Sequence, residues 1–280
     1  MLRKGLAIAV LGLALVGGPA LAAGSQKEPR TADWSFSGPF GKFDRAQLQR
    51  GFKVYREVCA ACHSMNLMSF RNLGQKGGPF YDPKYPNPND NPYVKTIAKD
   101  FEVSDIDQET GDVVKRPATP ADRFPNPYPN EAAARAGNGG ALPPDFSTIS
   151  KARMGGPNYI YSLLSGYSAP PAGLEVPNGQ YYNPYMLGDV SAFWKGKGHA
   201  PPGGFIAMPP QLAADKVTFD DGTKSTIDQQ ARDVAVFLAW ASEPKMEERK
   251  AFGVGAMVYL LILAGILYVS YRRIWRNVAH

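Results

Sequence analysis

GFKVYREVCAACH, residues 51–63, is the most informative stretch of this sequence. It ends in two cysteines separated by two residues, Cys59 and Cys62, with His63 directly after them. On a helical turn, positions i and i+3 lie on one face, so both thiols can add to the two vinyl groups of one porphyrin as thioethers. The imidazole of the next residue then reaches the iron. This spacing is the attachment motif of a c-type haem, and it predicts one covalent haem c.

Other interpretations of these cysteines explain less of the pattern. Two cysteines in an exported protein would ordinarily suggest a disulfide. A thioredoxin-like redox pair would not require His63, and no βαβ pattern surrounds the motif. A zinc site would need further ligands, and the chain has only two more histidines, His199 and His280. Haem attachment accounts for all three residues.

An amphipathic helix leads into the attachment motif. Asp44 and Gln47 form a start that resembles a capping box, and apolar residues then recur at helical spacing up to Cys59. A second helix is expected to start at Thr226 and to stop before Pro244. We expect the apolar face of this second helix to pack on the haem core.

The chain between these helices is dense in proline and glycine, from residue 79 to 144 and again from 170 to 210. Long loops are uncommon in a compact domain unless they are functional. A porphyrin supplies a large apolar surface that loops can wrap, so less of the core must come from helices. The predicted fold class is therefore mainly α with long irregular loops.

Both ends of the chain carry apolar segments. Arg3 and Lys4 precede a short apolar run and a small-residue cleavage pattern, which favours a secretory signal peptide over a retained anchor. Residues 251–271 carry no charge, and about 20 helical residues cover the ~30 Å hydrocarbon core. The expected organisation is a signal peptide at 1–22, a haem domain at 23–248, a transmembrane helix at 249–272 and a cytoplasmic tail at 273–280.

The net charge of +6 belongs to the ends of the chain. Without Arg3, Lys4 and the three arginines that follow the apolar segment, the exported part carries only about +1. No basic stripe with interleaved aromatic residues remains, so we expect no nucleic-acid partner. Six acidic residues gather between Asp100 and Asp112, and a solvated loop is a simpler interpretation of them than a docking patch.

The iron needs a sixth ligand, or else an open position for ligand chemistry. Met65 and Met68 lie too near His63 in sequence to reach the opposite haem face, and Met257 lies in the apolar segment. The remaining candidates are Met154, Met186, Met208 and Met246. Met208 is preferred, with Met186 second, because prolines follow Met208 and stiffen an extended loop before the last helix of the haem domain. For any one methionine, core packing is the alternative.

The ordered set of motifs along the chain resembles the cytochrome c1 family, the haem subunit of the cytochrome bc1 complex. The resemblance covers nearly the whole mature chain. A lone C-x-x-C-H motif indicates only a haem, whereas the ordered set indicates a family. Besides GFKVYREVCAACH, the set comprises ALPPDFS at 141–147, KAR at 151–153, GPNYIY at 156–161, YNPY at 182–185, FDDGT at 219–223 and WASEP at 240–244.

The resemblance implies a class I cytochrome c-type haem domain with one C-terminal transmembrane helix. It implies that His63 and Met208 are the axial ligands of the haem iron. Arg153 and Tyr159 match the family's contacts to the haem propionates. The family's haem-wall segment is matched by Asn138, Ala141, Pro143 and Pro144.

The function that the resemblance implies is single-electron transfer from a Rieske iron–sulfur protein to a soluble or tethered cytochrome c. Cytochrome b and the Rieske protein would be the other subunits of a dimeric complex in a bacterial inner membrane. The haem domain would lie on the periplasmic side and the C-terminus in the cytoplasm. The isolated chain is not expected to be an enzyme, because quinol oxidation belongs to partner subunits.

This sequence departs from compact family members in two ways. It has extra residues between Tyr185 and Ile206, and it has no third or fourth cysteine to form the disulfide of some bacterial members. The residues also allow two other functions. One is a tail-anchored cytochrome that delivers electrons to a terminal oxidase, and the other is a haem sensor or peroxidase with an open distal position.

Overall fold

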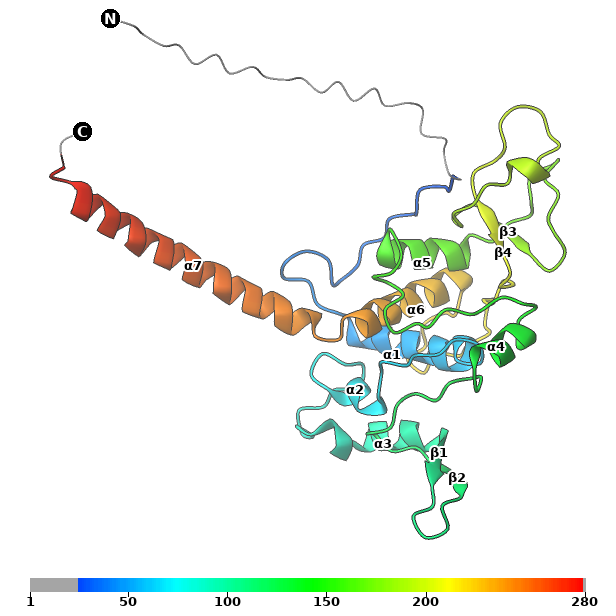
Figure 1. Cartoon of the computed structure of the whole chain (residues 1–280), viewed down its shortest axis with the longest axis horizontal. Coiled ribbons are helices and arrows are strands. Elements are labelled where there is room, and N and C mark those ends of the chain that lie inside the picture. Colours follow the sequence, from blue (N-terminus) through cyan, green and yellow to red (C-terminus); the bar gives the residue numbers. More distant parts are fainter. Residues whose placement is uncertain (1–24, 279–280) are drawn as a thin grey trace, which may run out of the picture.

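The computed structural model describes residues 25–278, so the signal peptide expected at 1–22 lies outside the described residues. A folded domain precedes one long C-terminal helix (Figure 1). The domain is mainly helical, with two small two-stranded sheets. Its elements, in chain order, are α1 Arg45–Val54, a π-helical turn Tyr55–Cys59, α2 Phe70–Gly74, a 3₁₀ turn Pro88–Asp90, α3 Pro92–Lys99, β1 Glu102–Ile106, β2 Val113–Pro117, α4 Glu131–Gly137, α5 Gly156–Ser165, β3 Tyr181–Asn183, a 3₁₀ turn Ser191–Phe193, β4 Gly204–Ile206, α6 Ile227–Ser242 and α7 Met246–Trp275.

Helix α1 begins as the sequence predicts. The side chain of Asp44 accepts a hydrogen bond from the backbone N–H of Gln47 at 2.9 Å, which satisfies one of the free donors of the first turn. The α-helical hydrogen bonding ends at Val54, and the chain continues as a single π-helical turn to Cys59, closed by Ala60 N–H on the Tyr55 carbonyl oxygen. The attachment motif therefore starts where the helix widens.

Helices α1, α5 and α6 form the centre of the domain, with α6 in contact with both of the others (Figure 1). Helix α6 begins with Thr226 as its N-cap, which accepts from Gln229 N–H, and it ends at Ser242 before Pro244, as predicted. Most of its residues are buried, and its Phe237 ring lies against Phe52 and Tyr55 of the attachment segment. Helix α6 thus supports the chain that carries the cysteines.

Gly51 is the point of closest approach between α1 and α6. A Cβ atom at this position would overlap the backbone carbonyl of Asp233 and would lie 2.7 Å from Cβ of Phe237. Only glycine leaves room for the two backbones to meet here. The contact sets the depth at which the attachment segment packs on α6.

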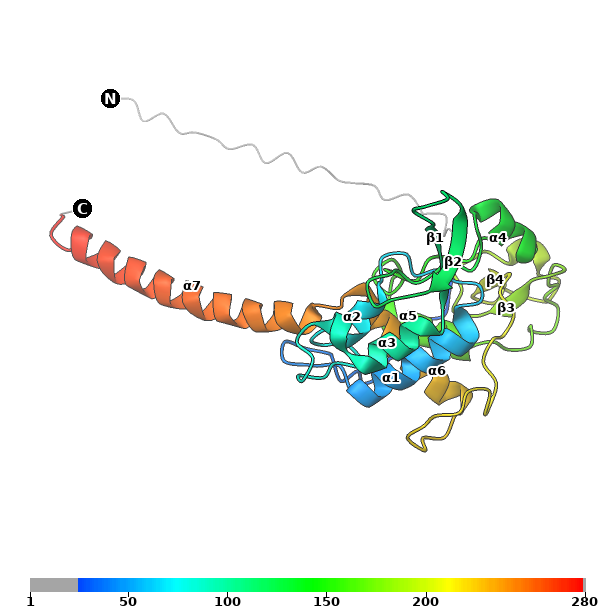
Figure 2. The ribbon, with the colours of Figure 1, turned by 90° about the horizontal axis from the view of Figure 1, so that it is seen from below.

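The proline-rich region after residue 79 is more ordered than the sequence predicts. It contains α3, which Asn91 caps by accepting from Tyr93 and Val94 N–H. The acidic segment from Asp100 to Asp112 is not the loop that we expect but lies mostly in a β-hairpin, which projects from the domain in Figures 1 and 2. Asp107 accepts from two backbone N–H groups of the turn and Gly111 takes φ 78°, so local turn chemistry outweighs the charge.

The extra residues between Tyr185 and Ile206 pack into a small apolar cluster together with residues that precede them. Leu174, Tyr182 and Val190 are buried together, with Trp194 and Phe205 packed against them. Strand β3 pairs with β4, which ends two residues before Met208. The insertion therefore shares a small core with the preceding segment and leads directly into the Met208 loop.

Helix α7 is long and apolar enough to cross a membrane, with a mean hydropathy of 2.3 over its most apolar window, and that window is not buried in the protein. Only Glu243 to Lys245 separate it from α6. Its first turn is fixed to the domain because Glu247 accepts two hydrogen bonds from the guanidinium of Arg45, at 2.8 and 3.0 Å, and one from Phe43 N–H. The helix leaves the domain from a braced junction.

We expect Gly51→Ala to destabilise the haem domain by about 1–3 kcal/mol, because the added methyl group pushes α1 away from α6. Chemical unfolding of the purified protein in detergent, followed by circular dichroism, measures this loss. Gly253→Ala in α7 is the matched control, because no atom lies within 4 Å of the added Cβ there. Equal stability of Gly51→Ala and the parent would contradict the close packing of the two helices.

Candidate haem site

Cys59 and Cys62 lie on the turn that follows α1. The backbone N–H groups of Cys62 and His63 both donate to the Cys59 carbonyl oxygen, at 3.1 and 3.0 Å. Both thiols are free and half-buried. Burial raises the pKa of Cys59 to about 12, so its thiol stays protonated at neutral pH. The two sulfur atoms and the histidine leave the backbone from one compact turn.

The His63 imidazole is buried and held by the 141–147 segment. Its Nδ1 lies 2.8 Å from the carbonyl oxygen of Pro144, and its ring stacks on Phe146 with 4.0 Å between centroids. A carbonyl oxygen only accepts, so Nδ1 carries the hydrogen and Nε2 keeps its lone pair. Burial lowers the pKa of His63, which favours the neutral form that binds metals.

Asp145 ties this segment to the attachment turn. Its carboxylate accepts from the Ser64 hydroxyl at 2.7 Å, from Asn66 N–H at 2.8 Å and from Ser147 N–H at 2.8 Å. Phe146 N–H donates to the Ser64 carbonyl oxygen at 2.8 Å. These bonds place the carbonyl of Pro144 beside the imidazole.

The segment that includes Asn138 and Ala141 reaches the attachment turn through Tyr128. The Tyr128 hydroxyl lies 3.9 Å from Sγ of Cys62, and its ring leaves no room for a side chain at Gly137, the last residue of α4. Asn138 caps α4 through its side chain, and Ala141 N–H donates to the Asn138 carbonyl oxygen. No sequence pattern indicates Tyr128, because an isolated aromatic residue in a proline-rich stretch belongs to no motif. Pro143, the remaining residue predicted for the haem wall, is half-buried.

The structure separates the methionines by environment. Met65 and Met68 are buried in the main core, and so is Met246 at the start of α7. Met154 is 85% exposed. Of the four predicted candidates, only Met186 and Met208 are half-buried. Both belong to the part of the chain that packs beside α5.

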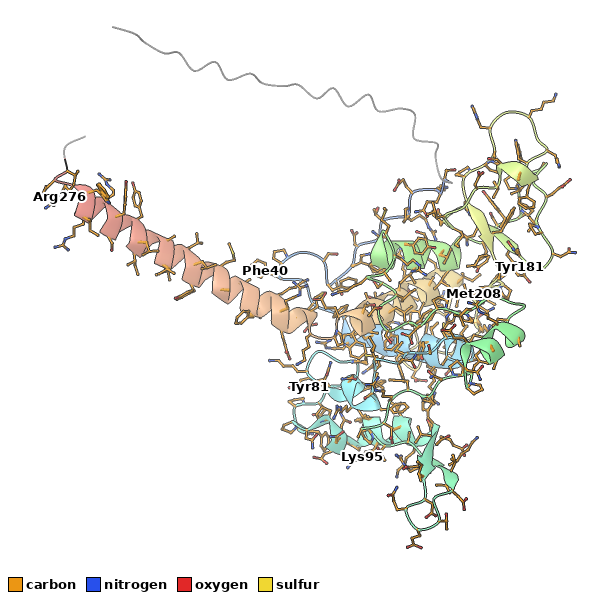
Figure 3. All side chains as sticks on the ribbon, viewed as in Figure 1. Phe40, Tyr81, Lys95, Tyr181, Met208 and Arg276 are labelled. Atoms are coloured by element: carbon orange, nitrogen blue, oxygen red, sulfur yellow. The ribbon has the colours of Figure 1, made fainter. Side chains whose placement is uncertain are left out.

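Met186 and Met208 differ in what holds them. The sulfur of Met186 lies 3.6 Å from the Tyr159 hydroxyl, which donates to it. Met208 is held through its backbone instead, because the Tyr167 hydroxyl donates to its carbonyl oxygen at 2.9 Å. Within residues 25–278 no hydrogen bond reaches the Met208 sulfur, so its lone pairs remain available to a metal. Figure 3 shows Met208 at the side of the domain away from α7.

Arg153 and Tyr159, predicted to contact propionates, lie at opposite extremes of exposure. Arg153 is exposed and its guanidinium donates to the Ala152 carbonyl oxygen at 3.1 Å. Tyr159 is buried, and burial raises the pKa of its hydroxyl while the charge of Arg153 acts in the opposite direction. The charge of Arg153 therefore acts on the Tyr159 hydroxyl, and its guanidinium can also bind a carboxylate.

These residues fit a c-type haem. Such a group requires two thiols for attachment, and Cys59 and Cys62 are free and three positions apart. It also requires donors to the iron, and the chain offers the free Nε2 of His63 and the unbonded sulfur of half-buried Met208. In the part of the chain that the structure describes, no cluster of three His, Cys, Asp or Glu side chains could hold a bare metal ion. These residues therefore suit iron that is held by a porphyrin better than a bare metal ion.

The fold and the site define a haem protein of electron transport with a membrane anchor helix. Residues 34–278 match the model of the Cytochrome C1 family, and the chain belongs to this family.

The chain is 40% identical to cytochrome c1 of Rhodospirillum rubrum over 98% of this chain and 97% of that protein. It is also 40% identical to cytochrome b/c1 of Bradyrhizobium diazoefficiens over 98% of this chain, but it spans only 41% of that protein's length. The mitochondrial cytochrome c1 heme protein of Saccharomyces cerevisiae is 45% identical over 81% of this chain and 65% of its own length.

The network around Asp145 generates a prediction for pH dependence. Burial disfavours the charged carboxylate, but the hydrogen bonds from Ser147, Asn66 and Ser64 outweigh it and hold the pKa of Asp145 below its usual range. A group of this kind stabilises the fold above its unfolded pKa of about 4, and this contribution is lost as the pH falls through the folded pKa.

We expect Asp145→Asn to lower the free energy of unfolding at pH 7, because it weakens the hydrogen bonds that the carboxylate accepts. The loss should be about 1 kcal/mol, since the group is partly exposed and water can replace some of these bonds. The variant and the parent should converge only as the pH falls below the folded pKa of Asp145, which lies below its usual range. Urea unfolding across this pH range tests both statements. Asp112→Asn, at the exposed hairpin turn, is the control and should track the parent at every pH. A constant difference between Asp145→Asn and the parent down to pH 2 would contradict the ionic role of Asp145.

Proposed function

We propose that this chain carries one covalent haem c and transfers single electrons from a Rieske iron–sulfur protein to a cytochrome c, as a subunit of a cytochrome bc1 complex. The observation that carries the proposal is the pairing of the Cys59–His63 turn with the Pro144 carbonyl, in a chain of the cytochrome c1 family. That pairing fixes the tautomer of the imidazole that directly follows the second thiol in the chain.

Each residue of the site has a defined task in this function. Cys59 and Cys62 would tether the haem through thioethers, and His63 would supply Nε2 while Pro144 fixes its ring. Met208 would supply its sulfur, and Arg153 and Tyr159 would bind the propionates, for which the Tyr159 hydroxyl turns from the Met186 sulfur to a propionate oxygen. When bound, the haem supplies an iron that alternates between the ferric and ferrous states. With His63 and Met208 both bound to it, the iron would have no free position for small gaseous ligands, which suits outer-sphere electron transfer.

The other haem-wall residues exclude water. Asn138, Ala141, Pro143 and Pro144 would line the haem edge between α4 and the attachment turn. A drier environment with a thioether ligand favours the ferrous state and raises the reduction potential. This tuning suits a carrier that receives electrons from a Rieske centre.

The proposed orientation puts the haem domain in the bacterial periplasm and the C-terminus in the cytoplasm, with α7 in the inner membrane. Arg272, Arg273 and Arg276 follow the apolar part of α7 and are typical of a cytoplasmic flank. The domain division follows the same order: signal peptide 1–22, haem domain 23–248, anchor 249–272 and tail 273–280. Cytochrome b and the Rieske protein would be neighbours within a dimeric complex.

Met208→Leu is expected to lower the midpoint potential sharply and to open the reduced protein to carbon monoxide, because leucine offers no lone pair to the iron. Potentiometric titration of the reduced haem absorption band and carbon monoxide difference spectra measure the two effects. Met186→Leu is the matched control and should keep the parent's potential and its resistance to carbon monoxide. If Met186→Leu changes both properties and Met208→Leu neither, Met186 is the ligand.

A pull-down of the tagged full chain from its own membranes tests the proposed partners. Copurification of a b-type cytochrome and a Rieske iron–sulfur protein, with quinol–cytochrome c reductase activity, is the expected result. Copurification with the subunits of a terminal oxidase instead would assign the chain to the other respiratory role.

A further inference from the structure

The two residues that follow Met208 cannot fix its loop by donating backbone hydrogen bonds. Pro209 and Pro210 follow Met208 directly and have no N–H to donate. Proline also restricts the residue before it to extended conformations, so the loop is locally stiff. Stiffness alone does not fix the loop relative to the rest of the domain. An attachment must come from another element.

Tyr167 supplies that attachment. It lies two residues beyond the end of α5, and its hydroxyl donates to the Met208 carbonyl oxygen at 2.9 Å across 41 positions of sequence. In the part of the chain that the structure describes, this is the hydrogen bond that the Met208 carbonyl accepts.

The end of α5 is itself fixed from two sides. Asn183 of β3 donates its side-chain amide to the Leu163 carbonyl oxygen at 2.8 Å, which satisfies a free acceptor of the last turn. Arg30 donates from its backbone to the Ser162 hydroxyl and lies with its guanidinium 4.5 Å from the Tyr161 ring centroid. Tyr167 therefore connects Met208 to an element that cannot easily shift.

Close packing does not replace this hydrogen bond. A cavity of about 540 Å³ opens beside the loop, and Tyr167, Tyr182, Pro210 and Leu212 contribute to its wall. Loop residues that face a cavity have fewer neighbours to hold them. A single hydrogen bond to the Met208 peptide then has more influence on where its side chain lies.

We propose that Tyr167 is a positioning residue for Met208: its hydroxyl holds the Met208 peptide against the end of α5 and thereby keeps the thioether in place for the haem iron. This inference rests on the proposed function, in which Met208 is an axial ligand. Tyr167 touches neither the iron nor the electron-transfer partners in this role. It acts through Met208 alone.

The test is Tyr167→Phe in the full chain with its haem, which removes the hydroxyl and keeps the ring. Loss of one such hydrogen bond weakens the ligated state by a factor of roughly two to ten. We expect carbon monoxide to bind the reduced variant roughly two- to tenfold more extensively, by the same hydrogen-bond factor. We also expect a weaker near-infrared charge-transfer band of the ferric Met-ligated haem and a lower midpoint potential.

Tyr182→Phe is the matched control. Its hydroxyl donates to the Pro202 carbonyl oxygen at 2.6 Å and its ring lines the same cavity as Tyr167, but it makes no hydrogen bond to the Met208 peptide. It should lose stability without a change in the charge-transfer band or in carbon monoxide binding. A merely structural role for Tyr167 would move thermal stability in both variants and leave the haem spectra of both alone.

The outcomes separate this inference from the proposed function. If the parent shows the charge-transfer band and excludes carbon monoxide but Tyr167→Phe matches it, the positioning role is wrong and the ligand assignment stands. Equal spectral changes in Tyr167→Phe and Tyr182→Phe would also overturn the positioning role. If the parent itself binds carbon monoxide and lacks the band, the ligation by Met208 is wrong, and the inference falls with it.

Discussion

The hydrogen bond from Nδ1 of His63 to the carbonyl oxygen of Pro144 joins two segments that lie 81 residues apart. Because the carbonyl accepts, the bond fixes the tautomer, holds the ring in place and leaves the lone pair on Nε2. Asp145 and Phe146 hold the carbonyl in place, and Phe237 of α6 supports the helix that carries the cysteines. Much of the domain thus serves to keep one imidazole in one orientation.

The two half-buried methionines, Met186 and Met208, both depend on α5. Tyr159, the fourth residue of α5, donates a hydrogen bond to the sulfur of Met186, whereas Tyr167, beyond the end of α5, donates one to the carbonyl oxygen of Met208. Of the two half-buried methionines, one therefore has its sulfur occupied and the other has its sulfur free. The insertion between Tyr185 and Ile206, which contains Met186, packs on a small core that it shares with Leu174 and Tyr182.

Helix α7 does more than keep the haem domain near the membrane. Helix α7 follows α6 after three residues, and Glu247 binds Arg45 at the beginning of α1. The attachment turn lies at the other end of α1 and its π-helical extension, about 20 Å along the helix axis from that junction. A braced junction of this kind fixes the orientation of the haem domain relative to the membrane helix, whereas a flexible tether would fix only its distance.

The sequence by itself determined the features that depend on neighbours along the chain. The caps at Asp44 and Thr226 and the uncharged helical run within α7 were predicted correctly, because they depend on residues that are close in sequence. The spacing of Cys59, Cys62 and His63 is likewise a local pattern. The hairpin in the acidic segment was missed because turn hydrogen bonds outweighed composition. Only the tertiary structure decided which imidazole nitrogen is free and which methionine sulfur is unbonded, and it alone revealed Tyr128 and Tyr167. Those properties depend on contacts between segments 27 to 81 positions apart, which packing creates and no local pattern encodes.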